Sequence, residues 1–120
     1  MRAVLVGLCL SVSLLSAGMA ADDMMANYYG NTILSAGPAG QSHSYYRADH
    51  TFETKLGNLD LKGTWSIDAK GQLCRLYDAG APPGIPRPLC TPWSAHKLGD
   101  NWIVTLGRST RQMTLVAGIR

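Results

Sequence analysis

Short runs of alternating apolar and polar residues, separated by turn residues, make up most of the chain after residue 30. In the clearest run, 51–56, Phe52 and Leu56 fall on one face and Glu53 and Lys55 on the other. This period of two is typical of a half-buried strand. Glycine, asparagine and aspartate interrupt the runs about every 8–12 residues, which predicts antiparallel strands joined by short turns rather than helices.

The pattern predicts an all-β fold of about seven or eight strands, closed as a small antiparallel meander barrel or rolled sheet. We expect strands at 31–35, 43–47, 51–56, 63–68, 72–77, 93–98, 101–106 and 112–117. Asp68 to Gly71 predicts a tight turn with Gly71 in a left-handed conformation. Before the first strand, residues 24–27 predict a short helical segment that Asp22 caps and Gly30 ends.

The start of the chain has the composition of an export signal. Arg2 supplies a positive charge, an apolar run covers 3–15, and small residues follow up to Ala21. A permanent membrane anchor is the alternative, but the run is short for a bilayer span. We therefore expect a signal peptide over 1–21, a single domain over 22–120, and a periplasmic or secreted protein.

Removal of the signal peptide would take Cys9 away and leave Cys74 and Cys90. An even pair of cysteines in an oxidising compartment favours a disulfide. The bridge would close a loop of about 15 residues and stabilise the fold by about 3 kcal/mol on the chain-entropy model. The alternative is that both stay reduced, with one a reactive thiol.

The charge of the chain is weakly positive. Eleven Lys and Arg stand against eight Asp and Glu, a net charge of +3, and Arg2 would leave with the signal peptide. These charges are too few and too scattered for a nucleic-acid or membrane-surface partner. No second apolar run is long enough to span a bilayer.

Several phrases occur in an order that resembles a known group of proteins. They are Gly-Asn-Thr at 30–32, Tyr-Tyr-Arg-Ala-Asp-His-Thr-Phe at 45–52, Gly-Thr-Trp at 63–65, Leu-Cys at 73–74 and a second cysteine at 90. This order resembles small secreted proteobacterial proteins of unknown function with a calycin-like β-barrel. His50 departs from the pattern, which has glycine there. The resemblance implies export, a disulfide and a β-barrel, and it transfers no activity.

Aromatic residues form one candidate binding site. Tyr46, Trp65 and Trp102 lie on predicted strands and could line the interior or mouth of a barrel. In larger barrels such a lining holds a small apolar ligand. The alternative is that these rings simply fill the core.

The loop 81–88 is the second candidate site. It is rich in proline, the predicted disulfide would close it, and Pro83, Ile85 and Arg87 are its candidate contact residues. A preorganised loop loses less entropy when it binds a partner. The alternative is a connector whose prolines prevent pairing of sheet edges.

The sequence contains no recognisable catalytic or metal-binding motif. His43, His50 and His96 have no ligand spacing, and no Gly-x-Ser-x-Gly elbow is present. We therefore expect no enzyme, no metal and no cofactor, and we leave the oligomeric state open. The favoured hypothesis is an exported binding module for an envelope or secreted protein or a small apolar ligand, one form being an inhibitor of an envelope or foreign hydrolase. A structural or stress-linked envelope protein without a discrete site is the alternative, and a small hydrolase or metal-dependent enzyme is the third.

Overall fold

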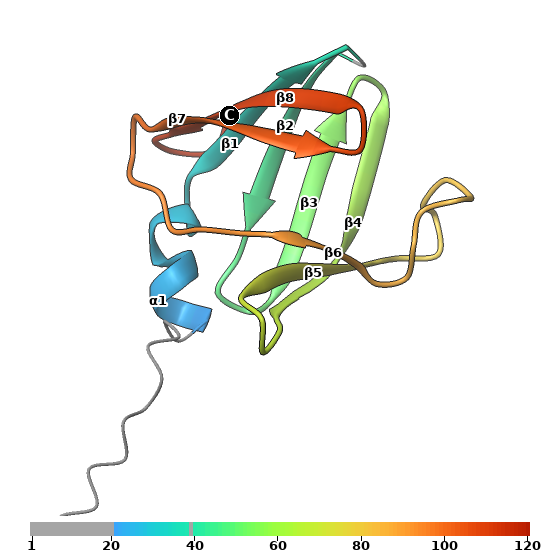
Figure 1. The fold of residues 1–120 in the computed structure, drawn as a ribbon, viewed down its shortest axis with the longest axis horizontal. Helices are drawn as coiled ribbons and strands as arrows, with labels where there is room; N and C mark the ends of the chain where they lie inside the picture. The colour runs from blue at the N-terminus through green and yellow to red at the C-terminus, as the bar shows by residue number, and fades with distance from the viewer. Residues whose placement is uncertain (1–20, 39) are drawn as a thin grey trace, which may run out of the picture.

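The protein is an all-β roll, in which one antiparallel sheet curls into half of a barrel (Figure 1). The computed structural model describes residues 21–38 and 40–120, so the predicted signal peptide lies outside the described residues except for Ala21. The strands are β1 (Thr32–Gly37), β2 (Gly40–Tyr46), β3 (Thr51–Leu56), β4 (Leu59–Ile67), β5 (Gln72–Tyr77), β6 (Leu89–Pro92), β7 (Asn101–Leu106) and β8 (Ser109–Val116). Their order across the sheet is β6-β5-β4-β3-β2-β1-β8-β7.

The predicted meander is confirmed. Strands β1 to β6 pair in succession, and β7 pairs with β8. The two parts join where β1 pairs with β8, with Ile33 opposite Leu115. Because β6 and β7 are the two ends of the sheet and are not hydrogen-bonded neighbours, the described part of the chain is a rolled sheet rather than a closed barrel.

The predicted strand at 93–98 is wrong. The sixth strand is β6, four residues earlier in the chain, where Cys90 lies opposite Cys74 of β5. Two carbonyl groups of the segment 93–98 accept hydrogen bonds from side chains: Tyr28 donates to the Ser94 carbonyl at 2.8 Å and Asn27 to the His96 carbonyl at 2.9 Å. Strand β4 also begins earlier than predicted, at Leu59.

The predicted turn between β4 and β5 is confirmed. Oδ1 of Asp68 accepts hydrogen bonds from the backbone N–H groups of Lys70 and Gln72, both at 2.9 Å. Gly71 has a φ of 76°, as the turn requires. At the β2–β3 turn His50 has a φ of 68°, and its ring stacks on Trp65 at a centroid distance of 4.1 Å.

A short helical segment closes one end of the roll (Figure 1). Helix α1 (Ala21–Met25) continues into the 3₁₀ turn η1 (Ala26–Tyr28), which confirms the predicted helical segment. Met25 and Tyr28 are buried. They pack in one core cluster with inward-facing side chains of the sheet, which are Ile33, Tyr46, Phe52, Trp65, Leu73, Tyr77 and Leu115. Among the described residues, every helix is too short or too polar to cross a bilayer.

Strands β4 and β5 pack so closely at Gly63 that a side chain has no room there. A Cβ atom at this position would collide with the carbonyl group of Leu76 on β5 and would lie 2.9 Å from Cε1 of Phe52 on β3. Gly63 therefore allows the sheet to curl tightly at the point where Phe52 fills the core.

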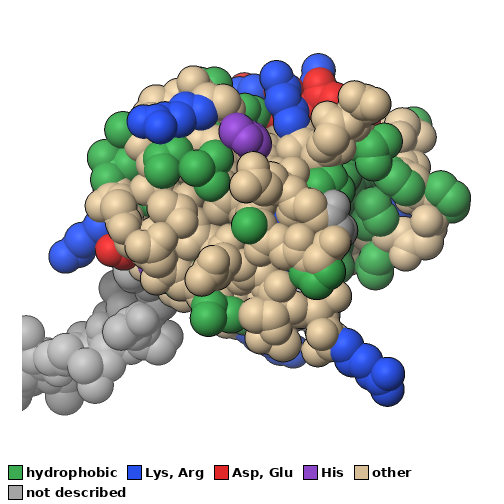
Figure 2. Space-filling view, turned by 90° about the horizontal axis from the view of Figure 1, so that it is seen from above, with side chains coloured by type: hydrophobic (Ala, Val, Ile, Leu, Met, Phe, Trp, Pro, Cys, Tyr) green, Lys and Arg blue, Asp and Glu red, His purple; other side chains and the backbone are tan. Residues whose placement is uncertain are grey.

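The surface seen from above carries scattered charged groups rather than a basic patch (Figure 2). On this face the Lys and Arg side chains do not gather into one patch, and some of them lie beside an Asp or Glu side chain. This distribution agrees with the weak and scattered charge of the sequence.

Candidate functional site

The interior of the roll is filled at one end and hollow at the other. Along β1, Ile33 belongs to the core cluster, whereas Ser35, two residues nearer the β1–β2 turn, lines a hollow of about 170 Å³. The lining consists of Ser35, Ser42, Ser44, Tyr46, Thr54, Arg75, Tyr77, Leu89, Thr91, Pro92, Trp93, Val104, Arg111 and Met113. We call this site the hollow; it combines hydroxyl groups, two guanidinium groups and an apolar wall.

Arg75 lies beside two aromatic rings of the hollow, Tyr46 and Trp93, which contact each other edge to face at a centroid distance of 5.5 Å. Its Nε donates to the Tyr46 hydroxyl at 2.7 Å, and its Nη1 donates to Oγ1 of Thr91 at 3.0 Å. The guanidinium carbon is 5.7 Å from the centroid of the Tyr46 ring and 5.4 Å from that of Trp93. These cation–π contacts and hydrogen bonds fix the side chain in place.

Arg111 lies on β8 and reaches across to β1 and the β1–β2 turn. Its Nε donates to Oγ of Ser35 at 2.6 Å, and its Nη2 donates to the carbonyl groups of Ser35 and Gly40 at 3.4 and 3.2 Å. Gly37 makes room for it, since a Cβ atom there would lie 3.1 Å from Cγ of Arg111. The sheet thus holds a second guanidinium against the wall of the hollow.

Neither guanidinium is neutralised by a carboxylate within the described residues. The ion pairs there involve Glu53, Asp60 and Asp100 as the acids and do not include Arg75 or Arg111. The described lining of the hollow contains no Asp or Glu. The hollow is therefore a positively charged site inside an otherwise weakly charged protein.

Two further polar groups lie around the hollow. Burial raises the pKa of the Tyr77 hydroxyl above its usual value, although the positive charge of Arg75 acts in the opposite direction. Tyr77 is therefore neutral at physiological pH. Nε1 of Trp93 is buried and has no hydrogen-bond partner among the described residues. Because an indole N–H only donates, this atom needs an acceptor that those residues do not supply.

The structure does not bring the three predicted aromatic lining residues to one site. Tyr46 lines the hollow. Trp65 is 2% exposed and packs in the core cluster, where its Nε1 donates to the Arg47 carbonyl at 2.9 Å. Trp102 lies on β7, stacked on His96 at a centroid distance of 3.7 Å, and lines the gap between β7 and the segment that follows β6.

The candidate loop projects from the sheet beyond the disulfide (Figure 1). Pro83 and Arg87 are exposed, whereas Ile85 is half-buried and packs against the core cluster. The exposed candidate contacts of this loop are therefore Pro83 and Arg87. Whether they bind a partner stays a prediction.

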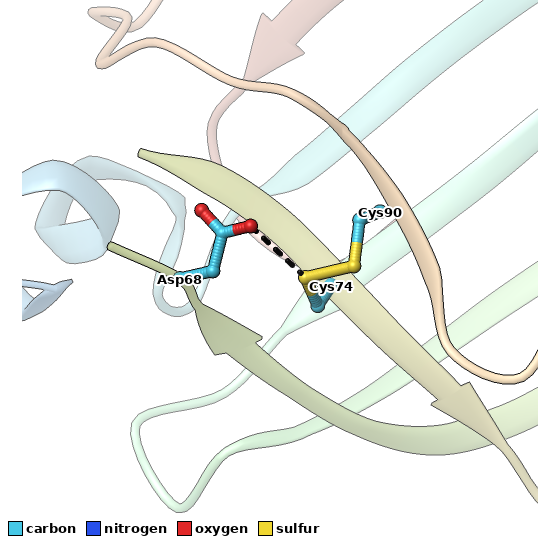
Figure 3. Close-up of side chains that lie close together, drawn as sticks. All are labelled: Asp68, Cys74 and Cys90. Carbon is cyan, nitrogen blue, oxygen red and sulfur yellow. Dashed lines mark hydrogen bonds between the residues drawn. A yellow bond between two sulfur atoms is a disulfide. The ribbon is translucent and has the colours of Figure 1, made fainter. Parts of the chain in front are cut away.

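The predicted disulfide between Cys74 and Cys90 is confirmed. It joins two residues that face each other on β5 and β6. Oδ2 of Asp68 lies 3.8 Å from Sγ of Cys74 (Figure 3), so the carboxylate and the two sulfurs are close enough to suggest a metal site. Sulfurs joined to each other offer no thiolate, which a metal would need, and we assign no metal to this group.

The three histidines lie in separate places. His43 contacts the Arg120 carbonyl at 2.9 Å, His50 stacks on Trp65, and His96 stacks on Trp102. Within the described residues none of them belongs to a group of three or more potential metal ligands.

Arg75 and Arg111 were not among the candidate residues predicted from the sequence. The alternation along the predicted strands did indicate them. Arg75 falls on the same face of its strand as Leu73 and Tyr77, and Arg111 falls on the same face as Met113. An arginine on the apolar face of a predicted strand points to the interior, where a charge needs a partner.

Comparison of the chain with protein-family models, with curated proteins and with solved structures finds no match.

Proposed function

We propose that the protein is a small exported binding module that takes a small molecule into the hollow. The observation that carries the proposal is the hollow of about 170 Å³ in the roll, since a domain of this size normally fills its interior with side chains. The lining combines an apolar wall with a few fixed polar groups, as binding sites for small molecules do.

The size of the hollow limits its ligand. Pockets for drug-sized ligands measure roughly 300–1,000 Å³, and the hollow is about 170 Å³. The ligand is therefore a small molecule, or one end of a longer molecule whose remainder lies outside the roll.

Export is part of the same proposal. A disulfide persists in oxidising compartments such as the periplasm and the extracellular space, and Cys74 and Cys90 form one. The charged start, apolar run and small residues of 1–21 support removal of a signal peptide before the binding module folds.

A fragment screen by ligand-observed NMR on the oxidised protein tests the binding function. Val104 is half-buried and lines the hollow, whereas its neighbour Ile103 is 65% exposed. We expect fragments that bind the wild type to lose binding in Val104→Trp, which fills the hollow, and to keep it in the control Ile103→Trp. No binding fragment at all, or equal loss in both variants, would refute a site in the hollow.

Recognition of a protein by the loop 81–88 is a second candidate function, favoured by its exposure next to the disulfide. Pro83 and Arg87 would contact the partner, which could be an envelope or foreign hydrolase that the protein inhibits. A preorganised loop would lose less entropy on binding it. Affinity capture from an envelope extract tests it. We expect a captured hydrolase to be lost with Arg87→Glu and retained with Arg108→Glu, which changes an exposed arginine at the β7–β8 turn. Capture that is insensitive to Arg87→Glu would count against the loop.

A further inference from the structure

We infer that the ligand of the hollow is a small organic carboxylate with a short apolar body, bound by Arg75, Arg111 and Trp93. The inference rests on the binding function proposed above and adds the chemical class of the ligand.

Three hydrogen-bond donors on residues that line the hollow have no acceptor within the described part of the chain. On Arg75, Nε and Nη1 have acceptors, and the described residues supply none for Nη2. On Arg111, Nε and Nη2 have acceptors, and the described residues supply none for Nη1. Nε1 of Trp93 is a third donor for which the described residues supply no acceptor, and it is buried. Arginine and tryptophan side chains cannot accept, so the missing partner must offer hydrogen-bond acceptors.

The charge of the hollow selects an anion among such groups. A guanidinium group carries a positive charge, and the described lining contains no acid to balance Arg75 and Arg111. Removing a charged group from water is unfavourable unless an opposite charge or several hydrogen bonds compensate it. A bound anion would supply both, because hydrogen bonds between oppositely charged groups are stronger than those between neutral ones.

The apolar residues of the lining indicate that the rest of the ligand is apolar. Val104 and Met113 on one side, and Leu89 with the ring of Trp93 on the other, form an apolar wall. A bare inorganic ion would leave this wall in contact with water, whereas an apolar body would cover it. A planar carboxylate can take parallel N–H bonds from a guanidinium, and the small volume requires that the body be short.

Phenylacetate and phenylacetamide are suitable probes, because they have nearly the same shape and differ in charge. Binding to the oxidised wild-type protein is measured by calorimetry and by tryptophan fluorescence. We expect phenylacetate to bind at least about tenfold more tightly than phenylacetamide, since hydrogen bonds to a charged group are the stronger ones. We expect inorganic phosphate to bind more weakly than phenylacetate.

Variants then identify the donors. Arg75→Met and Arg111→Met should each weaken phenylacetate binding by about tenfold or more, and Trp93→Phe, which keeps a ring and removes the N–H, by about tenfold. Arg108→Met, which removes an exposed arginine outside the hollow, should leave it unchanged. Where a methionine variant fails to fold by near-UV circular dichroism, Arg75→Lys and Arg111→Lys keep the charge without the planar fork and should still weaken binding.

The outcomes separate the two proposals. Equal affinity for both probes, phosphate as the tighter ligand, or unchanged affinity in the arginine variants would overturn the carboxylate and leave a binding module intact. Fragments that bind in the hollow while phenylacetate does not would overturn it as well. A screen in which no fragment binds the hollow would overturn the binding function itself.

Discussion

The substitution Gly63→Ala tests how tightly the sheet curls between β4 and β5. At a strand position with an ordinary φ, alanine in place of glycine stabilises a protein by about 0.4–1 kcal/mol, because it restricts the unfolded chain. At Gly63 the added Cβ would collide with the backbone carbonyl of Leu76 and would lie 2.9 Å from Cε1 of Phe52. The sign of the effect therefore depends on whether these two groups can move.

Neither group can move freely. The Leu76 carbonyl belongs to the ladder between β4 and β5. The Phe52 ring is 1% exposed and packs against Tyr46 and Tyr77 at centroid distances of 5.9 and 5.1 Å. Overpacking of a core costs about 1–3 kcal/mol, and a collision with backbone puts Gly63→Ala at the upper end. We expect a loss of about 3 kcal/mol and a fall in Tm of about 12 °C or more.

Urea denaturation followed by tryptophan fluorescence measures the change, and Gly80→Ala is the matched control. A Cβ atom at Gly80 meets nothing within 4 Å, and Gly80 is not among the glycines with a positive φ. The control should be as stable as the wild type or up to about 1 kcal/mol more stable. A Gly63→Ala protein within about 0.5 kcal/mol of the control would refute the close approach of β4 and β5.

Three further predictions concern the disulfide, the helix and acid stability. Replacing Cys74 and Cys90 by alanine should lower the free energy of unfolding by about 3 kcal/mol, because the bridge spans 16 residues; reduction of the wild type should give the same urea midpoint, and a smaller shift would contradict the entropy model. Met25→Ala should cost about 2–5 kcal/mol, since Met25 is fully buried, and an unchanged midpoint would show that α1 does not close the roll. The Lys97 backbone N–H, and after it the His96 side chain, hold the pKa of the Asp100 carboxyl below its usual value. This contribution to stability is present above the pKa of the unfolded state and is lost as the pH falls through the pKa of the folded state, so Asp100→Asn should lose less stability than the wild type below about pH 4.

The strands that the sequence predicted well are those whose alternation is local. The run 51–56 and the turn at 68–71 were placed correctly, because strand faces and turn residues depend on a few neighbouring positions. Strand β6 was missed because its only strong signal is a partner, Cys74, sixteen residues away. Its short length and the prolines around it resemble a loop.

The binding site was predicted only in part. The alternation of residues along each strand places Tyr46 and Arg75 on inward faces. It does not show which part of the interior will be filled by side chains. That depends on the curl of the sheet and on where α1 packs. Trp65, for which lining and core filling were both open, lies in the core cluster at the end of the roll where α1 and η1 pack.

The pairing of β1 with β8 determines the order in which the molecule can assemble. The other pairings join strands that follow each other along the chain, whereas this one brings together Ser35 and Arg111, which are 76 residues apart. Closing so long a loop costs conformational entropy before the contacts between β1 and β8 can offset it. The meander from β1 to β6 can therefore form before β8 pairs with β1. Until β8 arrives, one edge of β1 has no partner, and its residues 32–37 carry no charge that would discourage another strand from pairing there. In a nascent chain, this edge is therefore where chaperone binding or misassembly would begin.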